Sequence, residues 1–369
     1  MRFYSKQHRH TCGVDLHGRN LYLCILDQQG DIRLHKRLRC DPELFLEAIA
    51  PYRDDLVVGA ECIFCWYWLA DLCADEGIPF ILGHALYMKA IHGGKAKNDR
   101  IDSKKIAVLL RSGAFPYAYV YPPLMRSTRD LLRRRLHFAR KRAELLTHIQ
   151  NTLTQYNRPK PSGRLTRSDN REGLPELFDD PAIQATIEAD LSLIDHYDGL
   201  IPELESTALG QGRIHDPDNL RRLQSVRGVG KILGLTLLYE IGDIARFPTV
   251  QTFSSYARLV KCGKESDGKK RGTSGAKIGN VHLKWAFSEA AVCFLEHNPP
   301  GQAFLQRLRR KHAKGKALSV LAAKLGRATY FILKQKTTFD MDCFLANCRR
   351  GGGEPDASLE PARPGSEPR

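Results

Sequence analysis

The chain has 369 residues, 42% of them hydrophobic, and carries 57 Lys and Arg against 41 Asp and Glu, a formal net charge of +16. No stretch reaches the roughly eighteen apolar residues of a membrane-spanning helix, and the N-terminal stretch lacks the apolar core of a signal peptide, so we expect a cytoplasmic protein. A charge this positive indicates an anionic partner. Nucleic acid is the first candidate, because no amphipathic terminal helix or lipidation motif supports a membrane surface.

The ten cysteines are irregularly spaced, which is typical of reduced, mostly buried thiols in a chain too long to need disulfides. Cys62 and Cys65 form a CxxC pair. No second pair follows it at the spacing of a zinc ribbon or finger, so we expect neither a zinc site nor a redox function here.

The first 120 or so residues alternate between predicted strands and helices. Apolar alternation and a Gly-containing turn predict an antiparallel meander over residues 11–37. Short apolar runs then predict buried parallel strands, and the segments around them have helical spacing. We therefore expect one α/β domain over residues 1–122. Its later strands are expected at 55–61 and 78–83, and its helices at 42–52, 63–77 and 99–113.

A long helix is predicted over residues 125–156, which contain neither Gly nor Pro and repeat apolar residues at intervals of three and four. A loop rich in helix breakers follows, and then a second helix over 179–207 that we expect to pair with the first. We interpret residues 123–215 as a helical coiled-coil region.

The first half of this long helix is strongly basic. Residues 126–142 hold eight Arg or Lys and one acidic residue. Such a stretch fits contact with an RNA or DNA backbone, which is electrostatic and independent of sequence. Its central run of Arg133, Arg134 and Arg135 is the expected contact.

The third region, residues 216–348, is predicted to be mainly helical. Residues 261–280 interrupt it with five glycines and six lysines or arginines, and we expect a loop there. The tail, residues 349–369, is rich in Gly, Pro and charge and is predicted to be disordered. The expected helices lie within 223–243, 250–260, 281–299 and 316–336.

Four carboxylates occupy positions that a metal site would use. Asp15 lies within the first predicted strand and Glu61 at the end of a buried one, where a carboxylate needs a partner. Asp99 and Asp102 lie one turn apart at the head of a helix. Together they suit two Mg²⁺ ions of the kind that clamp the oxygens of phosphoryl transfer. Alternatively, Asp99 caps its helix, Asp102 favours the helix dipole and Glu61 opens the next helix.

Three short stretches resemble the acidic motifs of the DEDD transposases of bacterial insertion sequences, the type named after insertion sequence one-hundred-and-ten. They are "GVDLH" (13–17), "VVGAE" (57–61) and "KNDRIDSKKIA" (97–107). The resemblance runs over nearly the whole chain except the tail. It implies an RNase H-like, RuvC-like first domain. It also implies that a metal-binding tetrad is made of Asp15, Glu61, Asp99 and Asp102.

Residues 225–247 resemble the opening of that family's second conserved domain and read as a helix-hairpin-helix. Gly228 and Gly230 would let the turn present backbone N–H groups to a phosphate, at the start of a helix that begins near Lys231. An ordinary turn between two helices is the alternative.

Residues 264–291 resemble the second block of the same domain, in which Ser266 occupies the position of the family's serine nucleophile. The family usually has glycine directly after the serine, whereas this chain has Asp267 and then Gly268. Ser274 is a rival that the motif spacing disfavours. A solvated DNA-binding loop with a merely polar serine is the alternative. The cations expected to bind the DNA phosphates are Lys264, Lys269, Lys270, Arg271 and Lys277.

The resemblance implies a transposase whose serine attacks DNA and forms a covalent link. It further implies a composite active site in a dimer or tetramer, Mg²⁺ as cofactor and a non-coding bridge RNA as guide. A RuvC-like nuclease or junction resolvase acting through metal and water is the second reading, and the serine block argues against it. A non-enzymatic nucleic-acid-binding protein is the third, and the intact tetrad argues against it.

Overall fold

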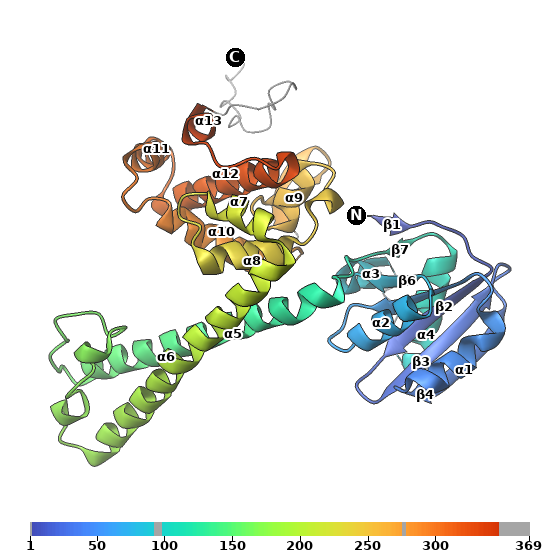
Figure 1. The fold of residues 1–369 in the computed structure, drawn as a ribbon, viewed down its shortest axis with the longest axis horizontal. Helices are drawn as coiled ribbons and strands as arrows, with labels where there is room; N and C mark the ends of the chain where they lie inside the picture. Colours follow the sequence, from blue (N-terminus) through green and yellow to red (C-terminus); the bar gives the residue numbers. More distant parts are fainter. Residues whose placement is uncertain (1, 92–97, 275–277, 347–369) are drawn as a thin grey trace. The chain divides into compact units, whose positions relative to one another are not determined.

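A computed structural model describes residues 2–91, 98–274 and 278–346 (Figure 1). The chain divides into two compact units, Met1–Pro123 and Leu124–Arg369. The tail that was expected to be disordered lies outside the described residues, as does Lys277. Within the described part, no helix combines the length and the apolarity needed to cross a bilayer.

A five-stranded mixed sheet with the order β4-β3-β2-β5-β6 forms the centre of unit 1 (Figure 1). The first three strands pair antiparallel, β2 with β3 and β3 with β4, and β5 and β6 then extend the sheet in parallel. The predicted meander and the two predicted parallel strands are thus confirmed. The strands are β2 (His10–Leu16), β3 (Asn20–Asp27), β4 (Ile32–Arg39), β5 (Leu56–Glu61) and β6 (Phe80–Gly83).

One face of this sheet carries α1 (Pro42–Ile49) and α2 (Tyr67–Asp75). Apolar side chains of both helices form one cluster with alternate residues of β2, namely Cys12, Val14 and Leu16. Because side chains alternate along a strand, the residues between them face the other way. The short elements of unit 1 are β1 (Phe3–Tyr4), which pairs with β7 (Phe115–Pro116), a 3-10 turn at Ala50–Tyr52 and α3 (Ala85–Ile91).

The other face of the sheet is covered by α4 (Asp99–Arg111). A Cβ at Gly13 would overlap the backbone of Ser103 and Ala107, so glycine at this position lets the helix lie directly against β2. His35 of β4 also contacts the helix, with its Nε2 3.2 Å from Ser103 Oγ. These contacts hold the first turn of α4 beside the end of β2.

Unit 2 begins with two long helices, α5 (Pro123–Gln155) and α6 (Pro181–His215), with two 3-10 turns between them (Ser168–Asn170 and Pro175–Leu177). Apolar residues from both helices share one buried cluster. The helices run antiparallel, and the ion pairs between them recur about every seven residues, as at the flanks of a coiled-coil seam. The coiled coil itself stays a prediction. These ion pairs are Arg135–Glu205, Arg142–Asp198 and His148–Asp190.

The rest of unit 2 is mainly helical, as predicted, and packs around one apolar core that includes Leu132 of α5. A 3-10 turn at Ile244–Arg246 connects α8 to α9. The helices are α7 (Pro217–Gln224), α8 (Lys231–Ile241), α9 (Val250–Tyr256), α10 (Val281–Cys293), α11 (Pro299–Arg309), α12 (Lys314–Gln335) and α13 (Met341–Ala346).

The prediction of a loop over residues 261–280 was wrong, because most of this segment forms a β-hairpin. Strands β8 (Cys262–Ser266) and β9 (Lys269–Ser274) pair antiparallel across a two-residue turn. The turn residues Asp267 and Gly268 both have positive φ, +55° and +66°. Asp-Gly is the pair that favours such a turn, because its twist matches that of the flanking strands. The glycine and lysine content obscured this local signal.

Candidate functional site

Two of the four predicted tetrad carboxylates leave the sheet from neighbouring parallel strands. Asp15 lies near the end of β2, and Glu61 is the last residue of β5. The parallel register pairs Val14 with Ala60. Asp15 and Glu61 are the next residues on the two strands, so they occupy equivalent positions at the same end of the strand pair. Asp15 follows Gly13 by two residues and therefore faces α4.

The other two carboxylates, Asp99 and Asp102, lie in the first turn of α4. The helix cap is Asn98, whose side chain accepts a hydrogen bond of 2.8 Å from the backbone N–H of Ile101. The alternative that Asp99 serves as the cap is therefore wrong. Asp102 forms an ion pair of 3.1 Å with Lys105 on the same helix. The capping role is thus filled without either aspartate, while the alternative that Asp102 favours the helix dipole stays open.

The electrostatics of Asp15 indicate that the four carboxylates share one neighbourhood. The pKa of Asp15 is raised to about 6, mainly by burial; the charge of His17 acts to lower it, and the charges of Asp99, Asp102 and Glu61 add to the increase. A carboxylate that loses charge because others crowd it is relieved by a cation. Carboxylate oxygens are the ligands that hard divalent cations take, so the donor set fits Mg²⁺.

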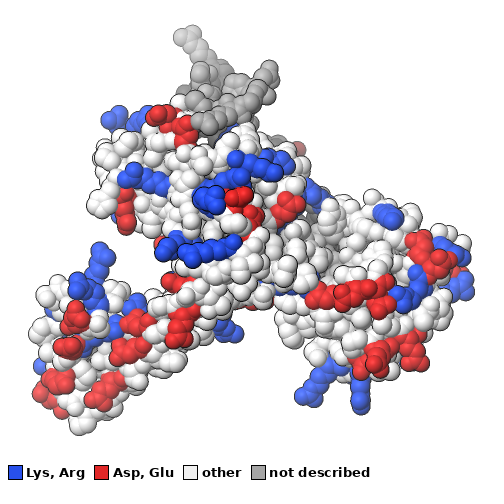
Figure 2. All heavy atoms as spheres, viewed as in Figure 1, with Lys and Arg blue, Asp and Glu red and all other residues white. Residues whose placement is uncertain are grey.

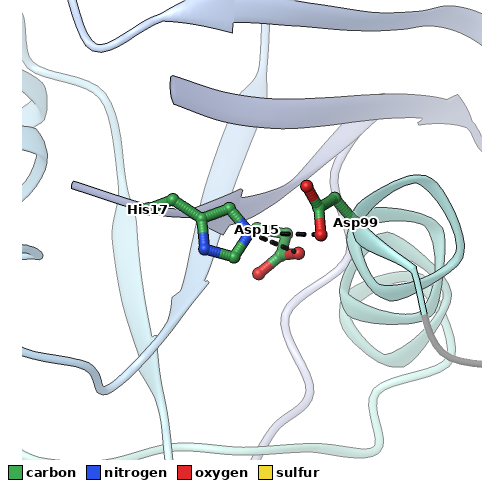
Figure 3. Close-up of side chains that lie close together, drawn as sticks. All are labelled: Asp15, His17 and Asp99. Carbon is green, nitrogen blue, oxygen red and sulfur yellow. Dashed lines mark ion pairs between the residues drawn. The ribbon is translucent and has the colours of Figure 1, made fainter. Parts of the chain in front are cut away.

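His17 belongs to the same site, although the sequence analysis did not single it out. Its Nε2 lies 3.4 Å from Asp15 Oδ2 and 3.3 Å from Asp99 Oδ1 (Figure 3). Asp15, His17 and Asp99 form a group of ligand atoms all within 4.8 Å of one another. The spacing in "GVDLH" was the available signal, since residues two apart on a strand share one face.

Ser266 is exposed and ends β8, directly before the hairpin turn. Lys269 begins β9 and is the cross-strand partner of Ser266. Directly opposed residues of an antiparallel pair project from the same face, so the lysine ammonium and the serine hydroxyl share one side of the hairpin tip. Asp267 and Gly268, which depart from the family pattern, are the residues that make this turn.

The other predicted hairpin residues are less informative. Ser274 pairs with Cys262 at the base of the hairpin, at the opposite end from Ser266. Arg271 is exposed on β9. Lys264 and Lys270 belong to the two strands, but their side chains lie outside the described part of the chain.

Asn280, which follows the hairpin and caps α10, binds a buried carboxylate, Glu240 of α8. Asn280 donates a hydrogen bond of 2.7 Å to Glu240 and accepts bonds from the first N–H groups of α10. Its own backbone N–H donates to the carbonyl of Tyr256, which precedes the hairpin. Arg129 and Arg133 of α5 also bind Glu240 and lower its pKa to about 2, although burial acts to raise it. Residues on both sides of the hairpin are thus tied to α8 and α5.

The predicted nucleic-acid contact on α5 divides into two kinds of arginine. Arg133 is paired with Glu240, and Arg135 with Glu205. Arg134 and Arg140 are exposed, and Arg134 lies over the ring of Phe138. On the face drawn in Figure 2, Lys and Arg are interspersed with Asp and Glu. The basic segment therefore stabilises unit 2 as well as contributing surface charge.

The turn before α8 contains the two glycines of the predicted helix-hairpin-helix, which stays a prediction. Gly228 has φ +84°, and a Cβ there would overlap the backbone of Phe294, so this glycine serves the close contact with α10. Gly230 precedes Lys231 at the N-terminus of α8, where no side chain provides a capping hydrogen bond. Both glycines line an open depression of about 710 Å³. The N–H groups of this helix end remain available to a phosphate.

Comparisons with known proteins match segments of both units. A transposase family model of the DEDD type matches residues 12–158, and a model described as "Transposase IS116/IS110/IS902 family" matches residues 220–306. The "Transposase for insertion sequence element IS1111A" of Coxiella burnetii is 23% identical over 339 residues, 89% of this chain and 90% of that protein. The "Putative transposase y4qE" of Sinorhizobium fredii is 26% identical over 221 residues, 58% of this chain and 53% of that protein.

Proposed function

Because this chain is a DEDD-type insertion-sequence transposase of the IS110 kind, an enzyme that acts on DNA, we propose that it breaks and rejoins DNA with a metal-binding tetrad and a serine nucleophile. The tetrad is Asp15, Glu61, Asp99 and Asp102, and the nucleophile is Ser266. The observation that carries the proposal is the hairpin tip, where Ser266 is exposed opposite Lys269. This placement suits a nucleophile that must reach a DNA backbone.

The tetrad supports the metal half of the proposal because Asp15 is partly buried and also feels the charges of Asp99, Asp102 and Glu61, which together raise its pKa to about 6. Bound divalent ions supply Lewis-acid stabilisation of the oxygens around a phosphorus atom. Asp15 and Glu61 would hold the ions from the sheet, and Asp99 and Asp102 from the first turn of α4. Two Mg²⁺ ions are proposed, as expected from the residue types.

The serine half consists of one displacement at phosphorus. The Ser266 oxygen forms a bond to phosphorus, one P–O ester bond of the DNA strand breaks, and the departing oxygen takes a proton. Lys269 lies on the same side of the hairpin as the serine and would stabilise the negative charge that develops on the phosphate. Rejoining is the reverse displacement, in which a DNA hydroxyl attacks the phosphoserine and releases Ser266.

Nucleic-acid binding is proposed at two further places in unit 2. The uncapped N-terminus of α8, with Gly230 and Lys231, would hold a DNA phosphate. The exposed Arg134 and Arg140 of α5 would contact the backbone of a non-coding bridge RNA that guides the enzyme to its target. A homo-oligomer, dimer or tetramer, completes the proposal, with the two parts of the active site contributed by different subunits.

The decisive experiment uses a nicked suicide DNA substrate carrying the element's end, incubated with the protein, its RNA and Mg²⁺. Denaturing gels should show a protein–DNA adduct with the wild type and none with Ser266→Ala. Ser274→Ala is the matched control, because it removes the same oxygen at the base of the same hairpin, and its adduct should persist. If the Ser266→Ala protein still cuts the DNA without an adduct, the enzyme acts as a metal-dependent nuclease.

A further inference from the structure

The structure points to His17 as an additional ligand of the metal site, and we propose that its imidazole nitrogen makes the site favour Mn²⁺ or Co²⁺ over Mg²⁺. This inference rests on the metal half of the proposed function. It adds a nitrogen donor to a tetrad that otherwise offers oxygen alone.

The position of the ring supports direct coordination. His17 Nε2 is nearly equidistant from carboxylate oxygens that come from two different elements, Asp15 on β2 and Asp99 on α4 (Figure 3). Both separations, 3.4 and 3.3 Å, exceed the usual range for an N–H···O hydrogen bond, about 2.7–3.2 Å. Adjacent ligand atoms around an octahedral ion with bonds of about 2.1 Å lie about 3 Å apart. The two separations from the histidine nitrogen are close to this value, and the three ligand atoms all lie within 4.8 Å of one another.

The backbone around His17 is held in place, which is the second feature that a ligand requires. Its N–H donates a hydrogen bond of 2.9 Å to the carbonyl of Asn20 across the turn between β2 and β3. Its carbonyl accepts a bond of 3.2 Å from the thiol of Cys40. His17 directly follows the last residue of β2, and its ring lies on the same side as Asp15, with Nε2 3.4 Å from Asp15 Oδ2.

The ligand chemistry determines the metal preference. Mg²⁺ binds carboxylate and water oxygens and gains little from an imidazole, whereas affinity for nitrogen ligands rises from Mn²⁺ to Co²⁺ and beyond. The competing explanation is that the ring acts only as a cation that offsets the carboxylate charges. The two explanations differ in one observable, which is whether a ring nitrogen bonds to the bound metal.

The test measures Mn²⁺ bound to the metal-stripped full-length protein. Electron spin-echo modulation of the bound ion should show coupling to ¹⁴N in the wild type and lose it in His17→Gln. Titration should show about a tenfold or larger loss of Mn²⁺ affinity in that variant, with Mg²⁺ affinity changed by less than about twofold. His137→Gln, which alters an exposed histidine of α5, is the matched control and should change neither quantity.

The outcomes separate this inference from the proposed function. If Mn²⁺ binds, is lost in Asp15→Asn and shows no ¹⁴N coupling in the wild type, then the tetrad holds metal and His17 is not a ligand. If the coupling persists in His17→Gln, another nitrogen provides it and the inference is overturned. If the wild type and Asp15→Asn bind Mn²⁺ equally, the proposed metal site itself fails.

Discussion

Replacing Glu240 by Gln should destabilise unit 2 by about 3 kcal/mol, because the change leaves two partly buried guanidinium groups, those of Arg129 and Arg133, without their counter-charge. The Glu240 side chain is 3% exposed, and it accepts hydrogen bonds from Arg129 (3.0 Å), Arg133 (2.6 and 3.0 Å) and Asn280 (2.7 Å). Glutamine has the same size but no charge.

Two estimates of the magnitude agree. These partners lower the pKa of Glu240 from 4.5 to about 2, a difference that corresponds to roughly 3 kcal/mol in favour of the ionised folded state. Removing one member of a buried ion pair typically costs about 3–5 kcal/mol.

The lowered pKa of Glu240 also determines how its contribution to the stability of unit 2 depends on pH. A lowered folded-state pKa contributes stability that is fully present above pH 4.5 and is lost as the pH falls towards 2. The difference in unfolding free energy between the wild type and Glu240→Gln should thus be constant above about pH 6 and should fall to less than about half of that value by pH 3.

Hydrogen exchange, measured by mass spectrometry on peptides from α8 and α10, reports the free energy of opening these helices and so measures the destabilisation locally. Glu144→Gln is the matched control, because it removes one charge from the exposed pair Lys141–Glu144 on α5 and should cost less than about 0.5 kcal/mol. A loss below about 1 kcal/mol for Glu240→Gln, or a loss that is unchanged at pH 3, would refute the reasoning.

Three further predictions follow from the site. In the metal-free protein, Asp15→Asn should raise the free energy of unfolding by about 2 kcal/mol above pH 7, because a pKa of about 6 makes ionised Asp15 unfavourable in the folded state. Urea unfolding measures this gain, which should be absent near pH 4. Gly13→Ala should cost about 1–3 kcal/mol by overlap with α4, whereas Gly18→Ala, which meets only ordinary contact, should cost less in the same assay. Reversing Arg134 and Arg140 to Glu should weaken RNA binding and reduce the slope of log affinity against log salt by about 2, and an unchanged slope in a filter-binding titration would contradict the proposed contact.

The paired arginines change how a charge-reversal experiment on α5 should be designed. Arg133→Glu would place a second acid beside Glu240, so lost binding could reflect a disturbed hairpin base instead of a lost RNA contact. Arg134 and Arg140 lack this ambiguity because they are exposed. A binding loss that appears with Arg133 alone would therefore indicate a structural effect.

The parts of this protein that depend on local residue pattern could be predicted from its sequence. Alternation of apolar residues over 11–37 and the apolar run of β5 were enough to predict the mixed sheet of unit 1. The three acidic motifs and the serine block were enough to indicate the transposase family that the comparisons support. The hairpin that carries Ser266 was also encoded locally, by Asp267 and Gly268, but the weight given to glycine and lysine content hid it.

Which charged side chains face one another could not be predicted in this way, because it depends on packing between distant segments. Arg133 and Glu240 are 107 residues apart, and no periodicity in either helix distinguishes this arginine from the exposed Arg134 beside it. His17 likewise joins Asp99 because Gly13 lets α4 lie against β2. Local pattern reports the face on which a side chain lies, whereas its partner is set by packing between distant segments, which exists only once the chain has folded.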